Sequence, residues 1–382
     1  MEEKIKGLVE KHDEYRRSSI NLIPSENAMA KDALKALPSD LATRYGTEWY
    51  GGSEYAMKIY EEANKLARKL FNVRYAILNA ISGNICDVAT IFAFTKPYDE
   101  IATIPKENGG YPFGYEKFHR KKYSIPMKEY EIDVSKLEMK KIPLTLLAQS
   151  TIFFPLPVEK MRENFDGIVV YDASHVIGLI AGNVFQDPLK EGSHAIIAST
   201  HKTLAGPQGG IVLTNDETIY EKFASYLLFD FDSGIGLVDN MHMNRVAALA
   251  IVFEELIRNG RRYASQIVKN AKALAAHLHE NGIAIKYANK GFTQSHQIML
   301  DMDKNKVYKF FKKLEENKIF IDCIGRIGVA EATHIGMKEK EMEEIAELML
   351  SVYKGKDVRK KAMELAMEFY EKFYSYRLFQ NE

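Results

Sequence analysis

The chain contains little cysteine and no excess of either charge. Both features exclude certain kinds of site and partner. Its 382 residues include only two cysteines, Cys86 and Cys323, too few for a disulfide framework or a thiolate metal site. Lysine plus arginine (52) equals aspartate plus glutamate (52), so net charge offers no attraction for nucleic acid or an anionic membrane. We therefore expect neither partner, and a reducing cytoplasm as the compartment.

Long apolar runs and clusters of metal ligands are also missing. No run reaches the length of a membrane span, and the acidic start MEEKIKGLVE does not look like a signal peptide. The ten histidines are scattered, so we expect no metal site. A chain of 382 residues can bury a large core and favours two domains over one.

What the sequence does contain is an alternation of short apolar runs and helical segments between residues 76 and 214. This alternation predicts an α/β fold with a mostly parallel sheet. Beyond residue 240 the pattern changes to that of a smaller α+β domain, with separate helices predicted at 243–257 and 263–280. The expected organisation is an N-terminal arm (1–20), a large domain (21–240) and a small C-terminal domain (241–382).

Two successive predicted strands end in ionisable residues. The run IIASTHK ends in Lys202, and the run GIVVY at 167–171 is followed by Asp172. A lysine in a turn is by itself more often a solvated surface residue. Parallel strands, however, open on one edge of a sheet, where ligands bind. An aspartate and a lysine at that edge are the two groups that a pyridoxal phosphate (PLP) site needs.

A third strand end is suited to bind an anion. The predicted strand at 76–79 leads into Ser82, Gly83 and Asn84, after which a helix is expected. Free amides and the helix dipole could hold a phosphate there, although a plain helix cap is the commoner explanation. A further strand, 144–150, ends in the hydroxyl of Ser150.

The segment RYGTEWYGGSEY at 44–55 packs three tyrosines and the only tryptophan into a short stretch. Its composition is typical of a loop that lines a ligand or a subunit contact, and a buried aromatic corner is equally consistent with it. The polar segment at 21–27, with Pro24, reads as a loop that leads into a helix.

Together these segments resemble serine hydroxymethyltransferase, a family of PLP-dependent enzymes. The lysine segment at 200–207 (THKTLAGP) carries the resemblance most specifically, supported by 172–175 (DASH), 50–55 (YGGSEY) and 326–328 (RIG). The resemblance covers most of the chain. It implies the aspartate aminotransferase-like fold, a small amino-acid substrate, PLP as cofactor, and a homodimer whose subunits share their active sites.

The resemblance also implies roles for individual residues. Lys202 would hold PLP covalently, Asp172 would face the ring nitrogen, and Ser25 and Arg326 would bind the substrate carboxylate. Tyr50 would lie over the reacting carbon. The remaining residues expected at the cofactor are Ser82, Gly83, Tyr111, Ser150, His175 and His201, with Tyr45, Gly234 and Gly236 from a second subunit.

The sequence departs from the family pattern at several of these positions. Thr47 stands where the family places a proton-handling glutamate, so that role would pass to Glu48. Tyr111 takes the place of a stacking histidine, and Gln208 that of an arginine. The long loop before the C-terminal arginine, part of the family's pterin pocket, is reduced to residues 321–324.

Three functions therefore stay open. The first is cleavage and formation of the Cα–Cβ bond of serine, with a tetrahydrofolate or another tetrahydropterin as one-carbon carrier. The second is a pterin-independent aldolase or transaldolase for threonine-like substrates, which the short loop favours. The third is a PLP-binding relative without catalysis. This is disfavoured because the chain retains the residues that the chemistry needs, Lys202, Asp172, His175 and Arg326.

Overall fold

The computed structural model describes residues 4–375, which form two compact units. One unit comprises residues 32–264, and the other joins residues 4–31 to residues 265–375. These divisions differ from the domain boundaries expected near residues 20 and 240. The reasons are that the segment before residue 32 pairs with a C-terminal strand, and that the helix at Met243–Glu280 begins after residue 240, with its residues up to 264 belonging to the 32–264 unit.

A seven-stranded sheet forms the centre of the 32–264 unit, in the order β2–β10–β9–β8–β7–β3–β4. The mostly parallel sheet predicted from the sequence is confirmed, but β10 is antiparallel to both of its neighbours. The strands are β2 (Tyr75–Ile77), β3 (Glu100–Thr103), β4 (Lys121–Ser124), β7 (Leu144–Ala148), β8 (Ile168–Asp172), β9 (Ala195–Ser199) and β10 (Gly210–Thr214).

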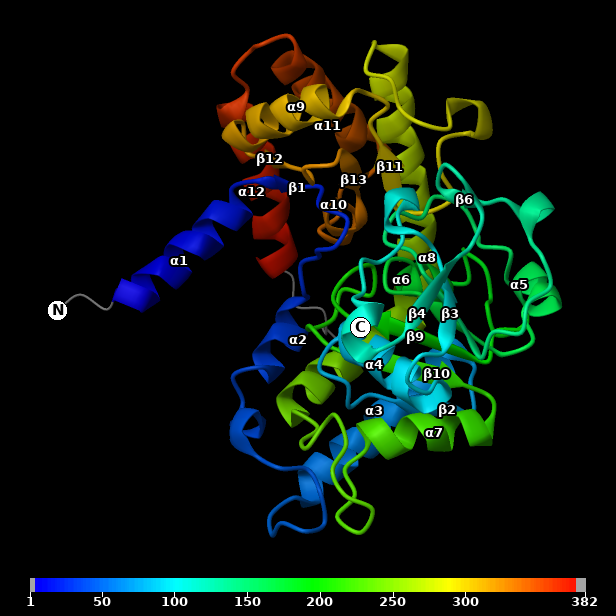
Figure 1. Cartoon of the computed structure of the whole chain (residues 1–382). Helices are drawn as coiled ribbons and strands as arrows, with labels where there is room; N and C mark the ends of the chain where they lie inside the picture. Colours follow the sequence, from blue (N-terminus) through cyan, green and yellow to red (C-terminus); the bar gives the residue numbers. More distant parts are fainter. Residues whose placement is uncertain (1–3, 376–382) are drawn as a thin grey trace. The chain divides into compact units, whose positions relative to one another are not determined.

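The central strands are apolar because helices cover them. Every residue of β7, β9 and β10 is buried, as is typical of strands with both faces covered. Figure 1 shows α4 and α7 beside this sheet, and both helices contact it. The helices of this unit are α2 (Lys31–Ala36), α3 (Glu54–Phe71), α4 (Gly83–Phe94), α5 (Val158–Asn164), α6 (Ile177–Ala181) and α7 (Glu217–Leu227), and a short hairpin joins β5 (Met127–Lys128) to β6 (Glu131–Ile132).

The prediction of two helices at 243–257 and 263–280 is wrong, because a single helix, α8 (Met243–Glu280), covers both ranges. Gly260 lies where the break was expected. A Cβ placed on Gly182 would come within 2.4 Å of Ala264 Cβ and 2.6 Å of the Gly260 carbonyl oxygen. The helix therefore packs tightly against residue 182, and this packing outweighs the low helix propensity of glycine.

The second unit is built from both ends of the chain. Strand β1 (Ile20–Asn21) pairs in parallel with β12 (Ile319–Phe320), the blue and orange segments that lie together in Figure 1. Strand β11 (Gln297–Met299) pairs antiparallel with β13 (Arg326–Gly328). The helices are α1 (Lys4–Arg17), α9 (Lys304–Glu316), α10 (Ala330–His334), α11 (Glu339–Tyr353) and α12 (Arg359–Ser375). Within residues 4–375, no helix is both long and apolar enough to cross a membrane.

Candidate active site

The predicted lysine and aspartate lie at the same edge of the central sheet. Asp172 ends β8, Ser199 ends β9, and the two strands run parallel. Lys202 Nζ donates a hydrogen bond to Ser199 Oγ at 2.9 Å, and the Ser199 amide donates to Ser174 Oγ at 2.8 Å. Ser174 Oγ donates in turn to Asp172 Oδ1 at 2.5 Å. A continuous chain of polar groups thus joins the amine to the carboxylate.

The environment of Asp172 both raises and lowers its pKa. Burial raises the pKa, whereas the charge of Lys202 and the two hydrogen bonds from Ser174 oppose that rise. The pKa of Asp172 is raised overall, which disfavours its charged form. A positive group bound nearby would stabilise that charged form. A carboxylate in this setting is suited to pair with a protonated ring nitrogen.

Two histidines flank this chain of hydrogen bonds. Burial, together with the charge of Lys202, lowers the pKa of His201 to about 4, so its ring is neutral at physiological pH. Its Nδ1 is buried without a hydrogen-bond partner among the described residues. His175 is almost fully buried just after Ser174. Both predicted histidines therefore lie next to the residues that join Lys202 to Asp172.

Helix α4 begins against the same edge of the sheet. Ser82 is its N-cap, and Ser82 Oγ accepts a hydrogen bond from the Ile85 amide at 3.2 Å. A Cβ on Gly83 would lie 2.3 Å from Ser199 Oγ and 3.3 Å from Ser174 Oγ. Only glycine allows this approach. The free amides of the first turn and the amine of Lys202 thus belong to one region, where an anion would be stabilised.

Ser150 follows the neighbouring strand β7, and Tyr111, which comes earlier in the chain, contacts the end of this strand. The Tyr111 amide donates to the Ala148 carbonyl at 2.9 Å, and the Tyr111 hydroxyl donates to Asn84 Oδ1 at 3.2 Å. Burial and the charges of Asp87 and Asp172 raise the pKa of Tyr111. The Ser150 amide donates to the Gly109 carbonyl at 2.7 Å. The structure therefore brings both predicted residues to the edge that carries Asp172.

Three members of this cluster were not predicted. Ser174 and Ser199 connect Lys202 to Asp172, and the position of each serine at a strand end was the available signal. Asp87 lies inside α4 with 2% of its surface exposed, and burial and the charge of Asp172 raise its pKa well above the usual range. A single acid within the apolar run ICDVATIFAF could have been noticed.

The segment at 44–55 forms a separate aromatic patch at the surface of this unit. The rings of Tyr45 and Tyr50 stack with centroids 4.4 Å apart, and Trp49 meets Phe231 edge-on at 4.4 Å. Trp49 is 63% exposed. Glu48 lines a cavity of about 390 Å³ in this patch, together with Thr47, Trp49, Met57 and residues 229–232.

The glycines predicted to bind the cofactor phosphate follow Phe231 along the chain. Gly234 has φ +92°, a conformation that favours glycine, and a Cβ on Gly236 would lie 2.6 Å from the Tyr226 carbonyl oxygen. Of the residues expected from a second subunit, Tyr45 belongs to the aromatic patch, and the two glycines follow the cavity-lining residues 229–232 along the chain. Neither Asp172 nor Lys202 lines this cavity.

The two residues predicted to bind the substrate carboxylate belong to the other unit, where they lie on adjacent segments. The Gly328 amide in β13 donates to the Leu22 carbonyl at 2.8 Å, and a Cβ on Gly328 would lie 2.5 Å from Pro24 Cα. Ser25 is therefore close in space to the strand that begins with Arg326. Arg326 Nε donates to Asp322 Oδ2 at 2.6 Å.

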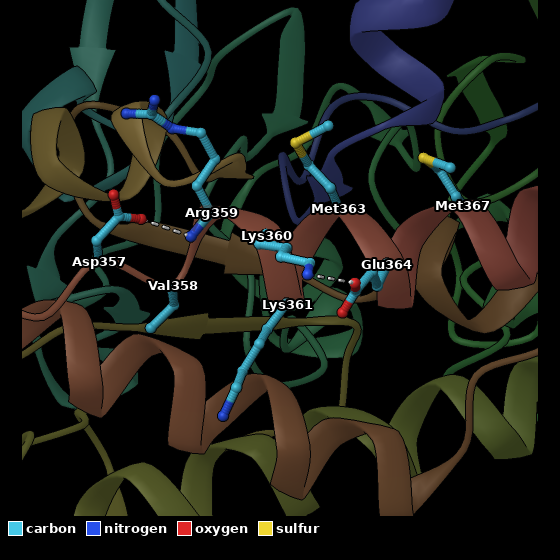
Figure 2. Close-up of a pocket in the computed structure, with 8 residues that line it drawn as sticks. All are labelled: Asp357, Val358, Arg359, Lys360, Lys361, Met363, Glu364 and Met367. Atoms are coloured by element: carbon cyan, nitrogen blue, oxygen red, sulfur yellow. Dashed lines mark hydrogen bonds and ion pairs between the residues drawn. The ribbon is translucent and has the colours of Figure 1, made fainter.

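A larger cavity, of about 620 Å³, lies elsewhere in this unit and contains none of the predicted site residues. Figure 2 shows its lining along the start of α12, where the Arg359 amide donates to Asp357 and Lys360 faces Glu364. In the part of the chain that the structure describes, no group of three His, Cys, Asp or Glu side chains is placed to hold a metal ion.

Comparison with known proteins agrees with this geometry. The serine hydroxymethyltransferase family profile matches residues 1–349. The chain is 35% identical to the serine hydroxymethyltransferase of Korarchaeum cryptofilum, over 97% of this chain and 95% of that protein. It is 36% identical to that of Methanopyrus kandleri, over 96% and 94%. The chain belongs to the serine hydroxymethyltransferase family.

A solved structure points to the same fold. The structure is similar to that of an L-threonine transaldolase from Pseudomonas fluorescens, with a TM-score of 0.85 and 25% identity over 97% of this chain and 91% of that chain. The predicted family and fold class are confirmed, as is the prediction of a PLP-dependent enzyme of the hydroxymethyltransferase or aldolase type that acts on small amino acids.

Proposed function

We propose that this enzyme reversibly cleaves the Cα–Cβ bond of serine to give glycine and passes the one-carbon unit to a tetrahydropterin, such as tetrahydrofolate. The hydrogen-bonded chain from Lys202 through Ser199 and Ser174 to Asp172 is the observation that carries this proposal. It supplies an amine and a carboxylate at one edge of a parallel sheet. The cytoplasm is the compartment that we propose for this reaction.

The residues at this edge fit PLP. The cofactor supplies an electron sink for the pair of electrons released at the substrate Cα. Lys202 would hold it covalently, Asp172 would keep its ring nitrogen protonated, and the cradle of Ser82 and Gly83 would bind its phosphate. The remaining contacts would come from His175, His201, Tyr111 and Ser150.

Arg326 and Ser25 would hold the substrate carboxylate, the arginine through its two terminal nitrogens. The exposed aromatic patch supports a homodimer in which it completes the site of the other subunit. In that arrangement Tyr45, Gly234 and Gly236 would reach the phosphate. Tyr50 would lie over the reacting carbon, and Glu48 would move the proton.

Purified enzyme incubated with serine tests this function. We expect PLP-dependent release of glycine that rises when tetrahydrofolate is added. The Lys202→Ala variant should lose both the reaction and the visible absorbance of lysine-bound cofactor. Lys190→Ala, which removes an exposed lysine paired with Asp187, should keep both. Glycine formation that ignores the pterin would contradict the transferase.

A second candidate is a pterin-independent aldolase or transaldolase for threonine-like substrates. Two observations favour it: the turn at 321–324 is short, and the structure is similar to a threonine transaldolase. Acetaldehyde release from threonine or allo-threonine, at a rate that tetrahydrofolate leaves unchanged, would support this activity. Turnover of serine alone would exclude it.

A further inference from the structure

The buried carboxyl of Asp87 has no role in the function proposed above. Asp87 follows Gly83 by four residues in α4, so both face the same side of the helix. Gly83 approaches Ser199 and Ser174, and α4 contacts both β8 and β9. The Asp87 carboxyl therefore faces the sheet edge that carries Asp172. We call Asp87, Asp172 and Lys202 the site floor.

No salt bridge within the described residues compensates a charge on Asp87, and only the more distant charge of Lys202 favours its ionised form. Its side chain is 2% exposed, and its Oδ1 has no hydrogen-bond partner among the described residues. A buried, unpaired carboxylate is strongly disfavoured. Two neighbouring carboxylates that share a buried site also disfavour each other's ionisation.

The surroundings decide which of the two acids carries the charge. Asp172 Oδ1 accepts two hydrogen bonds from Ser174, whereas Asp87 Oδ1 accepts none from the described residues. The other titratable groups that face Asp87 are Lys202 beyond β9, Tyr111 and Tyr115 from the segment before β4, and Cys86 on α4 itself. Burial and the charge of Asp172 raise the pKa of Asp87, and Lys202 only partly offsets them.

We propose that Asp87 is a positioning residue of the cofactor site, which carries a proton at neutral pH and so leaves Asp172 as the single ionised carboxylate of the site floor. The floor is then electrically neutral, with one negative charge on Asp172 and one positive charge on Lys202. That this single negative charge pairs with the ring nitrogen of bound PLP rests on the function proposed above. The proton on Asp87 does not, because it follows from the protein alone.

Infrared spectroscopy of the full-length protein tests this directly. At pH 7 we expect the carbonyl stretch of a protonated carboxylic acid, and this band should be lost in Asp87→Asn. Glu331 is a second fully buried acid whose pKa is raised by burial, so Glu331→Gln is the matched control. A Glu331→Gln protein without any such band would overturn the proposal, even if Asp87→Asn failed to fold.

Unfolding by urea as a function of pH gives an independent reading. Above about pH 5, folded wild type holds a proton on Asp87 that the unfolded chain releases, so its stability falls as pH rises toward the folded pKa. The ratio of unfolding constants, wild type over Asp87→Asn, should rise by up to about tenfold per pH unit. If the unfolding constants of wild type and Asp87→Asn changed equally with pH, Asp87 would not carry the proposed proton and its role would be packing alone. Neither measurement needs bound cofactor, so both can fail or succeed independently of the proposed reaction.

Discussion

Asp322 fixes Arg326 from one side, in the turn that replaces the longer family loop. Its Oδ2 accepts from Arg326 Nε at 2.6 Å, and its Oδ1 accepts from the amides of Ile324 and Arg326 at 3.1 and 2.9 Å. This contact holds the guanidinium at Nε, whereas the proposed function assigns the fork that binds the substrate carboxylate to the two terminal nitrogens. If Arg326 binds the substrate carboxylate as proposed, Asp322 sets the orientation in which its guanidinium does so.

Replacing Asp322 by asparagine should loosen this fork. The amide can still accept from the two backbone groups, but it loses the charge that holds the guanidinium. We expect KM for serine to rise roughly twofold to tenfold, with kcat changed little, because one partly buried ion pair is lost. Steady-state kinetics check this, with Asp303→Asn, at the start of α9, as the control. A drop in kcat at constant KM would contradict it.

His201 makes the stability of the enzyme depend on pH. Its pKa is lowered to about 4, mainly by burial, so between about pH 6.5 and 4 the unfolded chain takes up a proton that the folded chain refuses. The contribution of neutral His201 to the free energy of unfolding is therefore complete above about pH 6.5 and decreases as pH falls through this window. His201→Asn should show a flatter decrease in urea midpoint than wild type or the exposed His12→Asn. An equal slope in all three proteins would show that His201 titrates normally.

At the scale of elements, the start of α4 depends on the absence of a side chain at Gly83. In Gly83→Ala the new Cβ would lie 2.3 Å from Ser199 Oγ and 3.0 Å from the Ser199 amide nitrogen, so the helix start must move. We expect the free energy of PLP binding to weaken by about 1–3 kcal/mol, which corresponds to a roughly fivefold to hundredfold lower affinity for PLP. Fluorescence titration with PLP measures this loss.

Gly7→Ala is the matched control, because Gly7 lies in α1 with no atom within 4 Å of the added Cβ. Alanine there should leave PLP affinity unchanged and slightly favour the helix. Equal affinities in Gly83→Ala and Gly7→Ala would mean that the start of α4 does not touch the cofactor.

The elements show which parts of this fold a sequence can predict. The runs before Asp172 and Ser199 consist of apolar residues, and the structure makes both of them largely buried strands. Apolar periodicity carries no direction, however, so it could not show that β10 runs antiparallel. It also suggested a helix end at Gly260, where contact with Gly182 keeps α8 continuous.

Some residues of the candidate site could likewise be predicted from the sequence, and others could not. Lys202 and Asp172 could be found because each lies at or just beyond the end of a strand. Asp87 could not, because its significance depends on which helix face meets the sheet, and that is set by the packing of α4 against β8 and β9. The pairing of residue 20 with residue 319 likewise depends on contacts between distant parts of the chain.

At the scale of the whole molecule, the proposed homodimer predicts how inactive variants behave when mixed. Tyr45 lies in the exposed aromatic patch and is expected to serve the partner's site, whereas Lys202 serves its own. A dimer of one Lys202→Ala and one Tyr45→Ala subunit therefore has one site with both lesions and one with neither. Random mixing makes half of the dimers hybrid, so about a quarter of all sites should be intact.

Recovery of about a quarter of wild-type activity, after two inactive proteins are unfolded and refolded together, would therefore demonstrate shared sites. Lys202→Ala mixed with Asp172→Asn is the control, because both residues belong to one site and every site keeps one lesion. That mixture should stay inactive. If the Tyr45 mixture also stays inactive although size-exclusion chromatography shows dimers, Tyr45 acts within its own subunit. The exposed aromatic patch then serves assembly alone, since burying its rings between subunits would stabilise a dimer without completing a site.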